Sequence, residues 1–129
     1  MLTQAQINDF RRALERRFVE VREDIRQALL QSDQESYIEL AGRVSDMEDS
    51  SAADLLVDVA LADIDRHVEE VRDIDAALLR IADGSYGLCV DCGDGIAAQR
   101  LEAYPTAQRC VVCQTIYESQ HMPKRSWSL

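Results

Sequence analysis

The chain has 129 residues, a formal net charge of −10 and four cysteines, which is enough length for one modest domain. This acidic excess argues against a generic nucleic-acid binder, because affinity for a duplex depends largely on Lys and Arg side chains that neutralise phosphates. The N-terminal residues lack the basic flank and apolar core of a secretion signal, and no apolar run approaches the ~20 residues needed to span a bilayer. We therefore expect a cytoplasmic protein without a membrane partner.

The acidic residues are concentrated in the middle of the chain. Residues 46–94 contain fourteen acids and three arginines, whereas residues 1–45 contain eight acids and seven arginines. A solvated helix face explains most such acidic runs. The alternative is an acidic surface that meets a basic or metal-containing partner.

The first predicted element is one long helix that begins after Thr3, its N-cap, and continues to about residue 43. No proline or glycine interrupts the chain before Gly42. Residues 31–36 are polar, and a weaker apolar face resumes after them. In the first part of the helix, apolar side chains recur every three or four residues and form one stripe: Ile7, Phe10, Leu14, Phe18, Val21, Ile25 and Ala28.

A second long helix is predicted from about residue 52 to residue 83, after an acidic loop at residues 45–51. Ser51 and Asp54 have the form of a capping box, and Gly84 is a natural stop. Two amphipathic helices with so short a loop should pack antiparallel within one chain. We therefore predict a mainly α fold: a monomeric coiled-coil hairpin over residues 1–83 with its tip near residues 45–51. The second stripe comprises Val57, Leu61, Ile64, Val68, Val71, Leu78 and Ile81 or Ala82.

Four cysteines in two Cys-x-x-Cys pairs predict a zinc site. Two residues between paired cysteines allow one tight turn to present both thiolates to a single metal, and the seventeen residues between the pairs fit two zinc knuckles. Four cysteine ligands leave no corner for water, so we expect one structural zinc. The alternatives are two disulfides or four inert thiols. The predicted zinc ligands are Cys89, Cys92, Cys110 and Cys113. They define a zinc-finger domain over residues 84–129, in which a last helix runs from Cys110 to about His121.

The sequence contains no clear signal for a further metal ligand or for a catalytic site. Both histidines, His67 and His121, are expected at the surface, because four cysteines already complete a zinc site. No serine or cysteine nucleophile has a paired base at a recognisable spacing, and no glycine-rich phosphate loop is present. We therefore expect no enzymatic activity.

The chain closely resembles the DksA/TraR-type transcription factors. The resemblance covers essentially the whole chain and rests on the hairpin, its acidic loop, and two stretches: Tyr86-Gly-Leu-Cys-Val-Asp-Cys-Gly93 and Arg100-Leu-Glu-Ala-Tyr-Pro-Thr-Ala-Gln-Arg-Cys110. It implies a factor that enters the secondary channel of bacterial RNA polymerase and modulates initiation without sequence-specific DNA contact. The family's tip pattern, Asp-x-x-Asp-x-Ala, faces the polymerase active site. Here Asp46 and Asp49 supply the aspartates, and Ser51 replaces the alanine.

A second departure from the family concerns guanosine tetraphosphate. Relatives that bind this nucleotide with the polymerase carry basic residues where this chain has Asp73, Tyr104 and Gln114. An anion would find less positive charge there, so we expect weak binding at most. Two other functions remain open: an adaptor whose coiled coil binds another helix and, further off, a thiol oxidoreductase that uses one cysteine pair.

Overall fold

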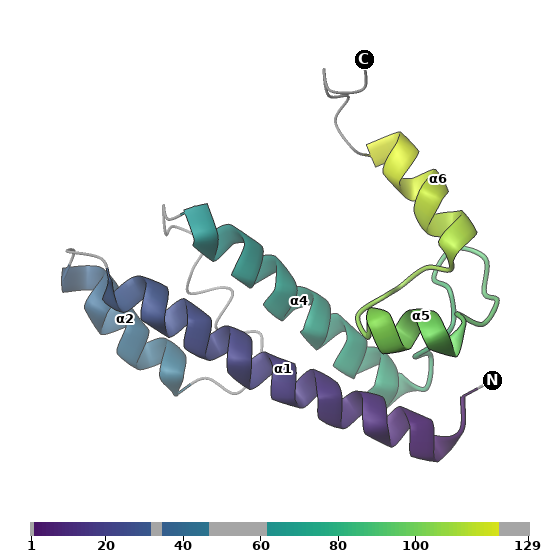
Figure 1. The fold of residues 1–129 in the computed structure, drawn as a ribbon, viewed down its shortest axis with the longest axis horizontal. Helices are drawn as coiled ribbons and strands as arrows, with labels where there is room; N and C mark the ends of the chain where they lie inside the picture. The colour runs from purple at the N-terminus through teal and green to yellow at the C-terminus, as the bar shows by residue number, and fades with distance from the viewer. Residues whose placement is uncertain (1, 32–34, 47–61, 122–129) are drawn as a thin grey trace.

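The computed structural model describes residues 2–31, 35–46 and 62–121, and this part of the chain is mainly α-helical. Leu88 and Gly95 form the one isolated β-bridge found there. The helices lie in an elongated layer, with the cysteine-containing region at one end (Figure 1). In chain order they are α1 (Gln4–Leu30), α2 (Glu35–Ser45), α4 (Ala62–Asp83), α5 (Ala98–Ala103) and α6 (Val111–His121).

Thr3 is the N-cap of α1, as the sequence predicted, and it forms a capping box with Gln6. The Thr3 hydroxyl accepts a hydrogen bond from the Gln6 N–H at 3.1 Å, and the Gln6 side chain accepts one from the Thr3 N–H at 2.8 Å. Two N–H groups that the first helical turn would leave unpaired are thereby satisfied.

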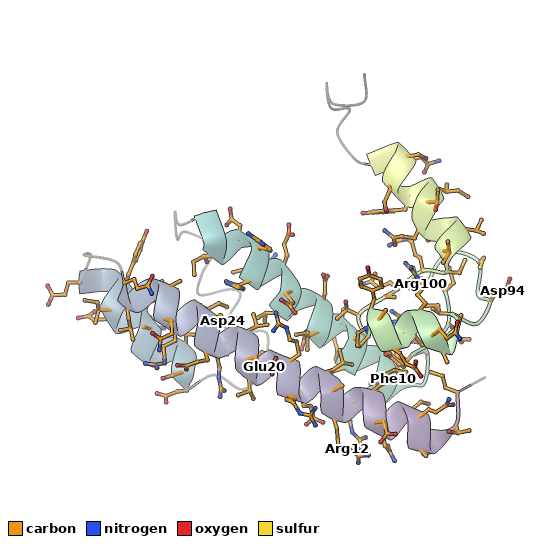
Figure 2. All side chains as sticks on the ribbon, viewed as in Figure 1. Phe10, Arg12, Glu20, Asp24, Asp94 and Arg100 are labelled. Atoms are coloured by element: carbon orange, nitrogen blue, oxygen red, sulfur yellow. The ribbon has the colours of Figure 1, made fainter. Side chains whose placement is uncertain are left out.

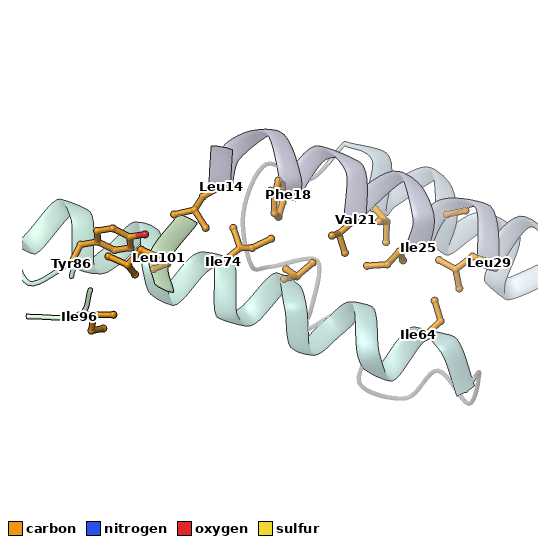
Figure 3. Close-up of a cluster of buried hydrophobic side chains, with 14 of the residues drawn as sticks. Leu14, Phe18, Val21, Ile25, Leu29, Ile64, Ile74, Tyr86, Ile96 and Leu101 are labelled. Atoms are coloured by element: carbon orange, nitrogen blue, oxygen red, sulfur yellow. The ribbon is translucent and has the colours of Figure 1, made fainter. Parts of the chain in front are cut away.

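The core lies between α1 and α4, which pack antiparallel (Figures 1 and 3). Leu14, Phe18, Val21, Ile25 and Leu29 form a continuous buried row on α1, which confirms most of the predicted first stripe. At the surface, Arg17 of α1 also pairs with Glu70 of α4, its Nη2 donating to Oε1 at 2.9 Å. The buried side chains of α4 are Ile64, Val71, Ile74 and Ala77. The predicted stripe omitted two of them, Ile74 and Ala77.

The predicted single helix to residue 43 is wrong, because the structure divides it into α1 and α2. Helix α1 ends at Leu30 with Gln31 as its C-cap, and α2 packs back alongside α1 in the opposite direction (Figure 1). Ala41 and Val44 are buried in the same core as Val21 and Ile25. Burial of this second apolar face against α1 favours the fold-back, and the polar residues 31–36 would add little packing to a continuous helix.

Part of the predicted hairpin lies outside the described residues. This applies to Asp49, Ser51 and the portion of the second helix before residue 62, Leu61 included. The described end of that helix agrees with the sequence prediction: α4 ends at Asp83, and Gly84 has φ +85°, a conformation that glycine reaches at little cost.

Buried side chains of the same core join the helical layer to the cysteine-containing region. Tyr86, Ile96 and Leu101 lie at that end of the core (Figure 3), and the Tyr86 ring centre is 5.8 Å from that of Phe10. Phe10 lies near α5, whereas Arg12 points away from the other helices (Figure 2). The short helix α5, which the sequence did not predict, contributes the fully buried Leu101. No helix in the described part is long and apolar enough to cross a membrane.

Candidate metal centre

The structure brings the four predicted cysteines together. Their Sγ atoms all lie within 4.8 Å of one another, and the Sγ atoms of Cys92 and Cys110 are 3.9 Å apart. Four sulfurs bound at ~2.3 Å to one tetrahedral zinc would be separated by about 3.8 Å. Both the spacing and the chemistry of the donors therefore fit a closed zinc site, with Cys89 buried and Cys92 at the surface.

The first knuckle, residues 89–93, is shaped by its own backbone. The Cys89 N–H donates to the Asp94 carbonyl at 2.7 Å, and the Gly93 N–H donates to the Cys89 carbonyl at 3.0 Å. Gly93 has φ +78°, in the left-handed region where a side chain would be strained. This closed turn directs Cys89 and Cys92 towards the same point.

The second knuckle, residues 110–113, leads directly into α6. The Cys113 N–H points at the Cys110 sulfur at 3.5 Å, and the Gln114 N–H donates to the Cys110 carbonyl at 2.9 Å. The first turn of α6 therefore carries one ligand and fixes the other. The helix runs from Val111 to His121, which confirms the predicted last helix.

Backbone N–H groups and neighbouring sulfurs give the thiols unequal acidities. Burial works against the Cys89 thiolate, but N–H groups of Cys92, Cys110 and Asp91 outweigh it and lower the pKa of Cys89 to about 6. Hydrogen bonding with the sulfurs of Cys110 and Cys89 raises the pKa of Cys113 above its usual range. Crowded thiolates repel one another, so a divalent cation is the natural counter-charge for the set.

Two residues to which the sequence analysis assigned no role attach the knuckles to the rest of the molecule. Arg80 of α4 donates from Nη2 to the Leu88 carbonyl at 2.7 Å, immediately before the first knuckle. The Tyr86 hydroxyl donates to the Pro105 carbonyl at 2.8 Å, in the segment between the knuckles. Neither contact follows a local spacing rule, so only the arrangement of the elements in space reveals them.

The remaining predicted site residues are placed less completely. Asp46 is exposed and directly follows α2, and α2 packs alongside α1 and does not extend it beyond its C-terminal end (Figure 1). This position differs from the predicted one at the far end of a two-helix rod. Asp49 and Ser51 are outside the described residues. His67 is half-buried on α4, and within the described part it does not belong to the cluster of possible metal ligands.

Comparison with known proteins gives consistent results. A family model described as the prokaryotic dksA/traR C4-type zinc finger matches residues 84–119. The RNA polymerase-binding transcription factor DksA of Escherichia coli (strain K12) is 30% identical over 117 residues, which cover 91% of this chain and 74% of that protein. The protein of that name from Caulobacter vibrioides (strain NA1000 / CB15N) is 36% identical over 96 residues, 74% of this chain and 63% of that protein.

A solved structure is also similar over most of its length. The transcription factor DksA2 from Pseudomonas aeruginosa matches with a TM-score of 0.61 and 25% sequence identity, and the match covers 93% of this chain and 88% of that one. Together, the C4-type family match and the four close sulfurs support one structural zinc held by Cys89, Cys92, Cys110 and Cys113.

Proposed function

The chain belongs to the DksA/TraR family, and from that premise we propose that it binds bacterial RNA polymerase and regulates transcription initiation. The observation that carries the proposal is the relationship over 91% of the chain to proteins named as RNA polymerase-binding transcription factors. The net charge of −10 supports recognition of a protein and not of a particular DNA sequence. This role is regulatory, not enzymatic, and places the chain in the cytoplasm with the polymerase.

The finer proposal is that the α1–α4 hairpin enters the secondary channel of the polymerase. At ~1.5 Å per residue, the 27 residues of α1 span about 40 Å. The zinc module, residues 84–121, occupies one end of the helical layer (Figure 1). An elongated layer with a broader module at its base suits insertion of the helices while the base stays at the channel rim.

We propose that the carboxylates of Asp46 and Asp49 act near the catalytic centre of the polymerase, and that Ser51, two positions after Asp49 in the sequence, belongs to the same site. Asp46 is exposed and available to a cationic or magnesium-containing site. In the free chain α2 packs alongside α1, so α2 would have to leave α1 for Asp46 to lead the hairpin into a narrow channel. The free and bound positions of α2 are therefore proposed to differ.

Guanosine tetraphosphate is proposed to add little to this activity. Burial raises the pKa of Asp73, and the nearby carboxylates of Glu69 and Glu70 raise it further. Tyr104 is exposed, and Gln114 carries no charge. None of these three side chains carries the positive charge that would pair with an anion.

The decisive experiment measures polymerase binding and promoter-complex lifetime separately. We expect Asp46→Asn and Asp49→Asn to bind core polymerase nearly as well as the unsubstituted chain and to lose most of its effect on the lifetime of a sensitive promoter complex. Glu39→Gln, which removes another exposed carboxylate of α2, is the matched control and should retain the effect. Competitor challenge at saturating protein gives the lifetimes.

The outcomes separate the two candidate functions. If the chain fails to capture core polymerase, the adaptor function becomes the better one. If it captures polymerase and both Asn variants act as strongly as the unsubstituted chain, the carboxylates are not its working groups.

A further inference from the structure

The last helix is attached to the rest of the molecule with little apolar packing. Among the described residues, none of the buried core side chains comes from α6, and Val112 and Ile116 on this helix are exposed. Cys113 ties its first turn to the metal. Cys110 and Cys113 both lie at the start of α6, so another contact must hold the later turns of the helix in one direction.

Arg109 makes such a contact on two sides. Its Nε donates to Oδ2 of Asp91 at 2.8 Å, and Asp91 lies between the two cysteines of the first knuckle. Its guanidinium carbon is 3.9 Å from the ring centre of Tyr117, in the second turn of α6. A cation at this distance over an aromatic face is attracted by the ring's quadrupole.

The arginine is itself held in place. Its carbonyl accepts a hydrogen bond from Nε of Arg100 at 3.1 Å, and its side chain is only 19% exposed. The backbone bond from the Val90 N–H to the Gln108 carbonyl, at 2.9 Å, joins the first knuckle to the segment just before the second knuckle and does not reach α6. Arg109 therefore supplies the connection from the first knuckle to the second turn of the helix.

We propose that Arg109 is a positioning residue that sets the direction of α6 relative to the zinc centre, through Asp91 on one side and Tyr117 on the other. The metal holds the start of the helix, and the arginine holds its second turn. A planar guanidinium suits this task, because it can stack on a ring while its edge donates to a carboxylate. This inference concerns the zinc-loaded chain alone and does not depend on polymerase binding.

The test uses zinc-loaded protein and NMR relaxation of backbone amides. In the unsubstituted chain, α6 amides should show order parameters near 0.85, as in a rigid backbone, and in Arg109→Ala they should fall below about 0.6. Zinc content should stay at one per chain, and the order parameters of α1 and α4 should not change. Arg26→Ala, which removes an arginine paired with Glu23 on α1, is the matched control.

Two substitutions of Tyr117 keep the test decisive if Arg109→Ala loses its metal. Tyr117→Leu removes the ring and should loosen α6 as Arg109→Ala does, whereas Tyr117→Phe keeps the ring face and should behave like the unsubstituted chain. Unchanged order parameters in zinc-loaded Tyr117→Leu would overturn the proposal. Loosening by Tyr117→Phe to the same extent would also overturn it, because the hydroxyl would then be the group that matters.

Discussion

Tyr86 shows how one side chain can join two parts of this molecule. It is buried, its ring lies against Phe10, and its hydroxyl donates to the Pro105 carbonyl at 2.8 Å. Burial raises the pKa of Tyr86 to about 12, although the positive charge of Arg80 opposes the shift. The neutral phenol is therefore the form that the folded chain favours.

The raised pKa makes stability depend on pH in the alkaline range. The contribution of neutral Tyr86 is fully present below pH 10, its ordinary pKa, and is lost as the pH rises through about 12. We expect Tyr86→Phe to lose about 1 kcal/mol at neutral pH with the missing hydrogen bond, and to melt with a weaker alkaline dependence. Melting temperatures between pH 10 and pH 12 provide the measurement. Tyr104→Phe, at an exposed position, is the control, and equal alkaline slopes in all three proteins would contradict this account.

The sequence revealed the metal ligands but not the residues around them. Two cysteines three positions apart meet through one local turn, so Cys89 and Cys92 could be paired from spacing alone. Arg80 and Arg109 act through contacts with residues eight or more positions away, and their partners depend on how the elements pack. An arginine in an acidic chain gives no signal that would distinguish these two from the solvated ones.

Among the helices, the pairing of α1 with α4 was predictable because both stripes are long and regular. The predicted α4 stripe nevertheless passed from Val71 to Leu78 and omitted Ile74, which is fully buried. A heptad pattern fixes the general face of a helix, whereas the packing of the neighbouring elements decides how wide the buried face becomes.

Ile74 and Leu79 provide a matched test of the α4 register. The Ile74 side chain is 0% exposed and that of Leu79 is 61% exposed. Ile74→Ala should lower the free energy of unfolding by ~2 to 5 kcal/mol, because a buried side chain leaves a cavity. Leu79→Ala should change it by less than ~0.5 kcal/mol. Urea denaturation distinguishes the two, and similar losses in both variants would show that the register is wrong.

The break between α1 and α2 could not be read from the sequence. Residues 31–36 contain no proline or glycine, so local propensity allows a continuous helix. The structure instead buries Ala41 and Val44 against α1. The packing of α2 against α1 therefore overrides a weak local preference for a continuous helix.

A charge at Val44 tests both the packing of α2 and its proposed movement. Val44 is fully buried, so Val44→Asp should destabilise the α1–α2 contact by several kcal/mol, in line with the ~3 to 5 kcal/mol found for an unpaired buried charge. If α2 must leave α1 for Asp46 to act, this variant should retain or strengthen the effect on promoter-complex lifetime. Ile38→Asp, at an exposed position of α2, is the control. Loss of the effect in Val44→Asp with polymerase binding intact would mean that the folded-back form is the active one.

At the scale of the whole molecule, the metal and the helical core stabilise different regions. The buried row from Leu14 to Leu29 lies on the helix that packs against α4 and α2, whereas the zinc module contributes Tyr86, Cys89, Ile96 and Leu101 at one end of the same core. A structural zinc contributes directly to the folding of the segment that binds it. Loss of zinc should therefore unfold one end of the molecule and spare the other.

Cys92→Ser tests this division. The variant should bind much less than one zinc per chain and lose the ordered arrangement of α5 and α6, while α1, α2 and α4, which hold most of the described helical residues, remain folded. Val90→Ser changes an exposed, non-ligand side chain of the same knuckle and should keep its zinc. Elemental analysis gives the metal content, and circular dichroism with amide hydrogen exchange locates the loss of structure. Collapse of the whole helical signal in Cys92→Ser would show that the zinc module is needed for the hairpin to fold, and retention of one zinc would show that three cysteines suffice.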